Sequence, residues 1–258
     1  MERTYVVTGA ASGIGAATAR YLRERGNRVI ASDLHDADVN CNLATSEGRA
    51  ALVEGVTRIS GGSIDAIVAN AGGGPQETMI ALNFFGAVAT ADGLRPLLKA
   101  SSAPRAVMVS SIASLSPPDP RIVEACLNMD EDAATLGARD AIDAGKEALD
   151  LYSYAKYALN CWCRRVASKP DWAGAGIALN VVAPGFVDTP AAAYILSDPE
   201  RRAQAGKMVP LRGAFPGRPE EMAAALAWCV SAENSLMTGQ ILFVDSGVEC
   251  SLRGQNSK

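Results

Sequence analysis

The chain has 258 residues, of which 48% are hydrophobic and 20% are charged, and its formal net charge is −4. This length suits one α/β domain with a full core, and the slightly acidic balance gives no electrostatic reason to expect a nucleic-acid partner. No apolar run approaches the roughly 20 residues of a membrane span. The chain also enters a strand-like run at Tyr5 with no signal peptide before it, so we expect a cytoplasmic protein that binds neither membrane nor nucleic acid.

Apolar strand-like runs alternate with helical patterns along almost the whole chain. The strand-like runs cover residues 5–7, 29–32, 64–69, 106–110, 177–182 and 241–244, and the helical patterns cover 16–25, 46–60, 78–99, 152–168 and 219–232. Uninterrupted apolar strands separated by helices are typical of a parallel sheet that is buried on both faces. We therefore expect one doubly wound Rossmann-type α/β domain over residues 1–258, with a parallel sheet of about seven strands and helices on both faces.

A glycine-rich turn follows the first strand and opens the first helix. Glycines allow a tight turn and a close approach of backbone N–H groups to a pyrophosphate, and the helix N-terminus adds positive partial charge. The residues that would line a dinucleotide here are Gly9, Ser12, Gly13, Ile14 and Gly15.

The second strand ends in an acid, Asp33, 18 residues beyond Gly15. A carboxylate at this place would accept the adenosine ribose hydroxyls. A 2′-phosphate beside Asp33 would be repelled by its like charge. Positions 12 and 34 hold Ser12 and Leu34, so no Arg or Lys stands there to offset that repulsion. The sequence therefore favours NAD over NADP, the alternative for Asp33 being an ordinary strand-end residue or helix cap.

Two segments interrupt the alternation of strands and helices. Residues 116–149 begin with a proline-rich stretch and continue as an acidic, alanine-rich insertion for which we expect helical structure. Residues 190–217 carry four prolines around an apolar cluster at 191–196. Long connections in a compact domain are usually functional, so we predict a substrate lid at 190–217; a passive surface excursion is the alternative.

Tyr152 and Lys156 stand four residues apart, one turn from each other on the same face of a predicted helix. A tyrosine hydroxyl is a poor base at neutral pH, and a neighbouring ammonium favours the phenolate. We therefore predict that Lys156 lowers the pKa of Tyr152 toward the working range. Ser111 follows the strand at 106–110 and adds a hydroxyl at the carboxyl edge of the sheet, with Ser110 as the alternative hydroxyl.

Together with four further motifs, these residues resemble the short-chain dehydrogenase/reductase superfamily over nearly the whole chain. The further motifs are Asn70-Ala71-Gly72, Asn83 within Ala81-Leu82-Asn83-Phe84-Phe85-Gly86, Pro184-Gly185-Phe186-Val187-Asp188-Thr189, and Thr238-Gly239-Gln240-Ile241 with Val244-Asp245.

The resemblance implies roles for the catalytic motif. Tyr152 would be the general acid/base that exchanges a proton with the substrate oxygen, and Ser111 would hydrogen-bond that oxygen. Lys156 would hold the nicotinamide ribose, and Asn83 would anchor a water in a proton relay. No metal is expected, because His35 is the only histidine and the six cysteines lack paired spacing, so free thiols are expected.

The remaining motifs would line NAD. Val187 and Thr189 would position the carboxamide of the nicotinamide. Asn42-Leu43 stands where the family commonly has an aspartate near the adenine, and Asp245-Ser246-Gly247 replaces D-G-G, a change that we expect to be local. The other residues implied in cofactor binding are Asn70, Ala71, Gly72, Tyr152, Lys156, Pro184 and Gly185.

The spacing between Ser111 and Tyr152 indicates a branch of the superfamily. These residues are 41 apart, far more than is usual, which resembles the bacterial 3α-hydroxysteroid dehydrogenase/carbonyl reductase branch. Coniferyl alcohol dehydrogenases share the plan, so the expected substrate is a hydrophobic secondary alcohol or its ketone: a steroid, terpenoid or aromatic carbonyl. The rival functions are a non-catalytic NAD-sensing regulator and a dehydratase or epimerase that uses NAD transiently.

The insertion also bears on assembly. An insertion directly before the helix of Tyr152 would crowd the surface through which the superfamily commonly forms tetramers. We therefore expect a homodimer that uses residues 219–244, with a tetramer as the alternative.

Overall fold

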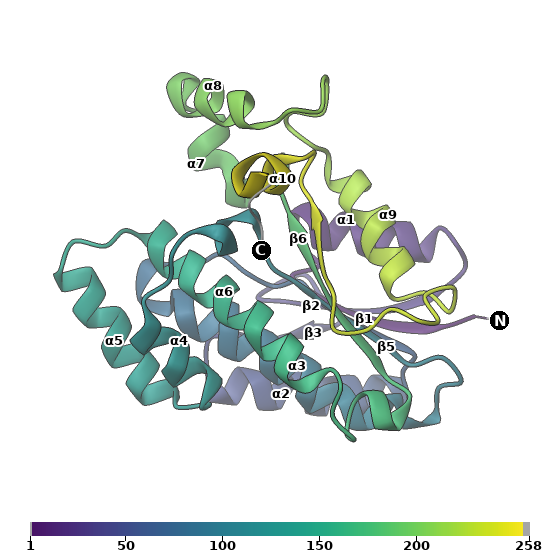
Figure 1. The fold of residues 1–258 in the computed structure, drawn as a ribbon. Helices are drawn as coiled ribbons and strands as arrows, with labels where there is room; N and C mark the ends of the chain where they lie inside the picture. The colour runs from purple at the N-terminus through teal and green to yellow at the C-terminus, as the bar shows by residue number, and fades with distance from the viewer. Residues whose placement is uncertain (1, 255–258) are drawn as a thin grey trace.

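Seven parallel strands form the centre of the molecule (Figure 1). The structure is a computed structural model that describes residues 2–254. Its sheet has the order β3-β2-β1-β4-β5-β6-β7, which confirms the predicted doubly wound fold. The strands are β1 (Thr4–Thr8), β2 (Arg28–Asp33), β3 (Val39–Asn40), β4 (Ala66–Ala69), β5 (Arg105–Val109), β6 (Ala178–Pro184) and β7 (Ile241–Val244).

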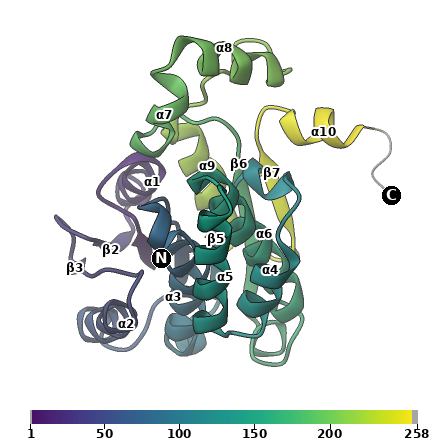
Figure 2. The same ribbon diagram turned by 90° about the vertical axis from the view of Figure 1, so that its left-hand side faces the viewer.

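Helices cover both faces of the sheet (Figure 2). On one face α1 packs against α9, and on the other lie α2, α3 and α6. The chain passes from β1 outward to β3 and then returns to place β4 on the other side of β1, so the direction of winding reverses between β1 and β4. Ligands bind at the carboxyl edge beside such a reversal. The bounds are α1 (Gly13–Arg23), α2 (Ser46–Ser60), α3 (Ala87–Leu94), α6 (Ala148–Val166), α9 (Pro219–Cys229) and α10 (Val248–Arg253).

The central strands are buried on both faces, which explains their uninterrupted apolar runs. In β1, Val6 packs in the cluster under α2, α3 and α6, whereas Tyr5 and Val7 pack in the cluster under α1 and α9. In β4, Ile67 and Val68 divide in the same way. Each fully buried aliphatic side chain of this kind contributes roughly 1.5–3 kcal/mol of transfer free energy.

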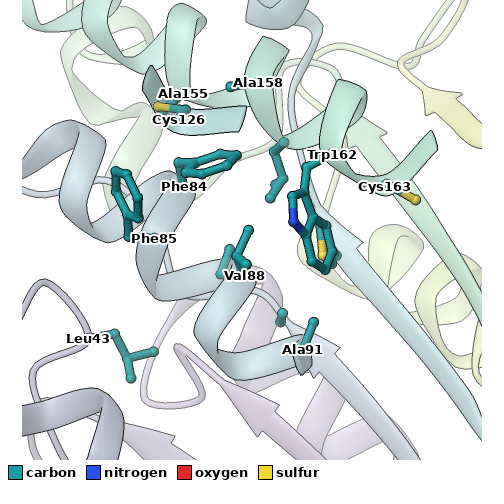
Figure 3. Packing of buried hydrophobic residues seen from close by; sticks show 14 of the residues in the cluster. Leu43, Phe84, Phe85, Val88, Ala91, Cys126, Ala155, Ala158, Trp162 and Cys163 are labelled. Carbon is teal, nitrogen blue, oxygen red and sulfur yellow. The ribbon is translucent and has the colours of Figure 1, made fainter. Parts of the chain in front are cut away.

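The insertion forms two helices, α4 (Pro120–Leu127) and α5 (Glu131–Asp143), and α4 packs against α6. Figure 3 shows Cys126 of α4 beside Ala155 of α6, next to Phe84. At the other end, Arg49 of α2 donates two hydrogen bonds of 2.6 Å to the Glu131 carboxylate. The insertion is therefore fixed to the domain through both its apolar and its charged sides.

The segment 190–217 contains α7 (Ala193–Leu196) and α8 (Pro199–Met208) and leaves the sheet beyond β6 (Figure 1). Its two ends meet, because Asp188 N donates to Gly217 O at 2.8 Å and Gly217 N donates to Phe186 O at 2.9 Å. Its returning arm is held at Leu211, whose N–H donates to Ser246 O at 3.2 Å. The segment is thus a closed loop attached beside β7.

The predicted helix at 78–99 is wrong as a single element. The chain instead forms a 3₁₀ turn at Gln76–Thr78, a π-helical stretch at Ala81–Gly86, α3, and a second 3₁₀ stretch at Arg95–Ala100. Pro96 lacks the N–H that an α-helix requires there, which ends α3. The two-residue strand β3 and the helix α10 were not predicted, because neither is long enough to show a period.

Three further sequence expectations concern membrane passage, thiols and the start of α6. Within residues 2–254, no helix combines the length and hydropathy needed to cross a membrane. All six cysteines are free thiols, and burial raises the pKa of Cys126 and of Cys163 to about 12. The helix of Tyr152 begins four residues earlier than predicted, at Ala148, because Glu147 and Asp150 form a capping box.

Candidate active site

The glycine-rich turn between β1 and α1 is shaped by residues that tolerate no side chain. Gly9 and Gly13 have φ of +68° and +52°, in the left-handed region. A Cβ on Gly15 would lie 1.9 Å from the carbonyl oxygen of Gly9. Ser12, the N-cap of α1, makes no side-chain capping bond, so the positive helix end is left for a ligand. This cradle fits a dinucleotide pyrophosphate.

Asp33 lies at the end of β2, directly beside this turn. One carboxylate oxygen accepts a hydrogen bond of 2.8 Å from Ala11 N, and the other accepts one of 2.7 Å from Leu34 N. The side chain is partly exposed. The structure therefore brings the predicted acid to the glycine turn, with surface left for a hydroxyl-bearing ligand.

Asn70 joins the ends of β1 and β4. Its amide Nδ2 donates to the carbonyl oxygens of Thr8 at 3.0 Å and Gly9 at 3.3 Å, and Ala71 N donates to Thr8 Oγ1 at 3.1 Å. A Cβ on Gly9 would lie 2.8 Å from Asn70 Nδ2. Asn70 and Ala71 thus hold the start of the glycine turn by hydrogen bonds to Thr8 and Gly9, at the reversal point of the sheet.

Asn42 and Leu43 divide between surface and core. Asn42 is exposed, and its Oδ1 accepts from Ala44 N at 3.0 Å. Leu43 is 4% exposed and packs in the core with Phe84 and Phe85 (Figure 3). Any contact of Leu43 with the cofactor would therefore come from its backbone, because the apolar side chain is buried in the core.

The motif after β6 reaches the glycine turn from the other side. A Cβ on Gly13 would meet the Thr189 methyl group at 3.2 Å. Val187 is buried and pairs with Gly217 in an isolated bridge. Pro184 ends β6, and a Cβ on Gly185 would lie 2.8 Å from Asp245 Cα. This segment therefore runs between the glycine turn and the β7 edge, as a wall of one continuous site.

Tyr152 on α6 and Ser111 after β5 come together although they are far apart in sequence. The Ser111 hydroxyl lies close enough to the Tyr152 phenol to oppose the rise in the Tyr152 pKa. Ser110 is buried instead, and its hydroxyl donates to the carbonyl oxygen of Lys156 at 3.3 Å. The geometry therefore favours Ser111 over Ser110 as the hydroxyl of the site.

The predicted effect of Lys156 on Tyr152 is not found. Burial raises the pKa of Tyr152 to about 12, and Lys156 does not offset this rise. The amine lies 5.4 Å from the centre of the Tyr152 ring and donates to Val109 O at 2.8 Å. Burial also lowers the pKa of Lys156 to about 7, so its charge is reduced at neutral pH.

Asn83 is fully buried in the π-helical stretch, and its side chain is engaged by the protein. Its Oδ1 accepts from Gly73 N at 3.0 Å, and its Nδ2 donates to Gly73 O at 3.0 Å and Met79 O at 2.9 Å. A Cβ on Gly72 would lie 2.8 Å from Asn83 Oδ1 and 3.3 Å from Lys156 Nζ. The side chain thus holds the loop after β4 beside Lys156.

Tyr194 is a site residue that the sequence did not single out. It belongs to α7 and lies near enough to Tyr152 for its charge to raise the pKa of that phenol. Tyr194 is 48% exposed. The sequence gives no signal for this proximity, because the 41 residues between the two tyrosines pass through α6 and β6.

Two family models match most of the chain. The short chain dehydrogenase model matches residues 3–122, and the Enoyl-(Acyl carrier protein) reductase model matches residues 133–249. The glycine turn and Ser111 fall in the first match, and Tyr152, Lys156 and Thr189 fall in the second.

Individual relatives match over almost their whole length. The chain is 34% identical to the 3-alpha-hydroxysteroid dehydrogenase/carbonyl reductase of Comamonas testosteroni, over 96% of this chain and 97% of the relative. It is 32% identical to the cis-4-hydroxycyclohexanecarboxylate dehydrogenase of Sinomonas cyclohexanicum, over 95% and 96%. Among solved structures, the 3-alpha-hydroxysteroid dehydrogenase from Pseudomonas sp. B-0831 in complex with NADH superimposes with a TM-score of 0.88 at 37% identity, covering 98% of this chain and 99% of that one.

Proposed function

The chain belongs to the short-chain dehydrogenase/reductase superfamily and is an oxidoreductase, and we propose that it interconverts a hydrophobic secondary alcohol and its ketone with NAD. One observation carries the proposal. Ser111, Tyr152 and Lys156 meet at the carboxyl edge of β5, on the same edge as the glycine turn. The similarity to enzymes named as hydroxysteroid dehydrogenases supports a bulky apolar substrate.

A nicotinamide cofactor held at the glycine turn would supply the hydride for the carbonyl carbon. The chain's own residues act on the substrate oxygen. With a pKa of about 12, Tyr152 carries its proton at neutral pH, which is the form that donates to the developing alkoxide. Ser111 donates a hydrogen bond to the same oxygen. In the oxidation direction Tyr152 must accept the proton, so alcohol oxidation accelerates as the pH rises above neutral.

Replacing the phenol tests this assignment. Tyr152→Phe should lower kcat by at least about 1,000-fold, since the proton donor is lost, and leave the Kd of NADH within about twofold. Tyr154→Phe is the matched control, because Tyr154 is a buried tyrosine on the same helix. Turnover is read by NADH absorbance and binding by NADH fluorescence. Unchanged turnover in Tyr152→Phe would refute the mechanism, and binding without turnover in the parent would favour the NAD-sensing regulator.

The preference for NAD rests on charge at the adenosine end. Asp33 is partly exposed beside the glycine turn, where a 2′-phosphate would be repelled. Asp33→Ala should lower the ratio of kcat/KM for NAD to that for NADP by about tenfold or more. Asp36→Asn, which removes an exposed carboxylate from the same loop, should leave the ratio unchanged. A parent enzyme that is faster with NADP at equal concentration would overturn the assignment.

The exposed apolar side chains of the segment 190–217, the proposed lid, favour an apolar substrate. Tyr194, Met208 and Leu211 are 48%, 40% and 61% exposed, so the segment offers apolar surface that is not used in the core. A panel of steroid, terpenoid, aryl-ketone and cinnamyl-type substrates would identify the class. We expect the highest kcat/KM for a steroid or similarly bulky alicyclic ketone.

A further inference from the structure

Asn160 lies on α6, eight residues beyond Tyr152 and four beyond Lys156, and therefore on the same face of the helix. It is 8% exposed. Its Nδ2 donates to Ser114 Oγ at 3.0 Å, and Ser114 Oγ donates to the carbonyl oxygen of Ser111 at 2.7 Å. A two-bond chain thus links the helix of Tyr152 to the backbone of Ser111.

The hydroxyl of Ser114 determines the direction of these two hydrogen bonds. A serine has one proton to donate, and Ser114 gives it to the Ser111 carbonyl. Ser114 can then only accept from Asn160, so the amide nitrogen of Asn160 must face it. This orientation leaves Asn160 Oδ1 buried without a partner among the described residues. A buried unpaired acceptor is destabilising and rare in native structures, so its retention indicates that the donor on the other side has a function.

The two hydrogen bonds of Asn160 and Ser114 and the contacts of Lys156 lie on opposite sides of Ser111 along the backbone. Lys156 Nζ donates to Val109 O at 2.8 Å, and Ser110 Oγ donates to Lys156 O at 3.3 Å, both on the strand side of Ser111. The Asn160–Ser114 link lies on the other side, in the 3₁₀ turn at Ile112–Leu115. One rigid helix therefore holds the segment both before and after Ser111.

We propose that Asn160 and Ser114 are positioning residues that fix the Ser111 hydroxyl against Tyr152 and the substrate oxygen. The inference rests on the proposed function, because it assigns the pair a task in that reaction. A misplacement of about 1 Å in a reacting group can cost about 100-fold in rate. The proposal explains why a helix whose first half carries Tyr152 and Lys156 also carries a buried amide one turn further on.

Single substitutions provide the first test. Asn160→Leu and Ser114→Ala should each lower kcat by about tenfold, with the substrate KM and the Kd of NADH within about twofold of the parent. Ser153→Ala is the matched control, since Ser153 is equally buried on α6 and donates to Leu149 O at 2.7 Å without any link to Ser111. Its kcat should equal that of the parent. If Asn160→Leu does not fold, Ser114→Ala carries the same test.

The background of Ser111→Ala separates positioning from a general structural role. If Asn160 acts through the Ser111 hydroxyl, Asn160→Leu should lower kcat by less than twofold once that hydroxyl is gone. The same tenfold loss in both backgrounds would overturn the proposal, as would a parental kcat in Asn160→Leu and Ser114→Ala. Tyr152→Phe separates a failure of this inference from a failure of the proposed function. If Tyr152→Phe loses turnover while Asn160→Leu and Ser114→Ala keep the parental kcat, the proposed function stands and only this inference is refuted.

Discussion

Tyr152 and Lys156 are one helical turn apart, and burial shifts the pKa of each in the direction that favours its uncharged form. The pKa of Tyr152 is raised to about 12 and that of Lys156 is lowered to about 7. Near neutral pH Tyr152 is therefore uncharged and Lys156 is only partly protonated, because both groups are shielded from water. Burying a lysine lowers the free energy of unfolding. Functional groups in enzymes commonly carry such a stability cost because the reaction requires them at that place.

The lowered pKa of Lys156 predicts a pH dependence of stability. Between pH 7 and about 10.4, the unfolded lysine holds a proton that the folded one has lost, so the free energy of unfolding rises with pH by at most about 1.4 kcal/mol per unit. Below pH 7 both states are protonated and the slope disappears. Relative to Lys156→Met, the parent should gain stability from pH 7 to pH 9.5 in urea unfolding. A constant difference between the two proteins would show that Lys156 keeps an ordinary pKa.

Ser246 adopts a left-handed backbone conformation that neighbouring hydrogen bonds support. It stands where the family has glycine and adopts φ of +59°, in the left-handed region that costs a non-glycine residue roughly 1–2 kcal/mol. Neighbouring bonds hold it there. Asp245 accepts from Gly247 N at 3.0 Å and from Glu249 N at 2.6 Å, which caps α10, while Ser246 O accepts from Leu211 N.

The proposed lid at 190–217 is organised around one aromatic residue. Phe215 packs edge-on against Phe186 with ring centres 5.9 Å apart, and the Arg202 guanidinium of α8 lies 5.8 Å from the Phe215 ring centre. A Cβ on Gly206 would meet the Phe215 ring at 3.3 Å. Phe215 therefore joins α8 to the base of the loop, next to the strand that leads into the site.

Removing this ring should loosen α8 while leaving the cofactor end intact. In Phe215→Ala we expect the KM for the apolar substrate to rise roughly tenfold, with the Kd of NADH within about twofold. Tyr21→Ala is the control, because Tyr21 also stacks with an arginine, Arg25 at 3.3 Å, but on α1. An unchanged KM in Phe215→Ala would argue that the segment is a passive excursion.

At the scale of the whole molecule, the surfaces available for self-association are unequal. The insertion helix α4 packs along α6 and covers part of its outer side. At the other edge, β7 pairs with β6 and, within residues 2–254, with no second strand. Trp228 and Leu236 are 45% and 95% exposed. We propose that a homodimer forms through residues 219–244, since an open strand edge with apolar neighbours is the surface that association would cover.

A charge placed on this surface should disrupt the dimer. Trp228→Glu is expected to yield monomers at micromolar concentration in sedimentation experiments, because an unpaired carboxylate would be buried at the contact. Leu136→Glu is the control: Leu136 is 60% exposed on the insertion helix α5, and its variant should remain dimeric. A tetramer, or a dimer that survives Trp228→Glu, would place the interface elsewhere.

Local patterns in the sequence were sufficient for six of the seven strands, the parallel sheet, the glycine turn and the spacing of the pair Tyr152–Lys156. Each depends on neighbours within a turn or a strand: apolar runs mark β1 and β4, and a four-residue spacing places two side chains on one helix face. Ser111 was found because it follows a buried strand, and strand ends meet at one edge of a parallel sheet. The family resemblance joined these pieces in order.

Only the tertiary structure decided the environments of these residues. It buried Leu43 in the core, engaged the Asn83 amide at Gly73, and brought Tyr194 and Asn160 to the site. It also reversed the expected pKa of Tyr152, because the loss of water around the phenol outweighs a lysine that burial itself makes less charged. Desolvation is a sum over all surrounding atoms, most of them distant in sequence, and a local motif carries no information about that sum.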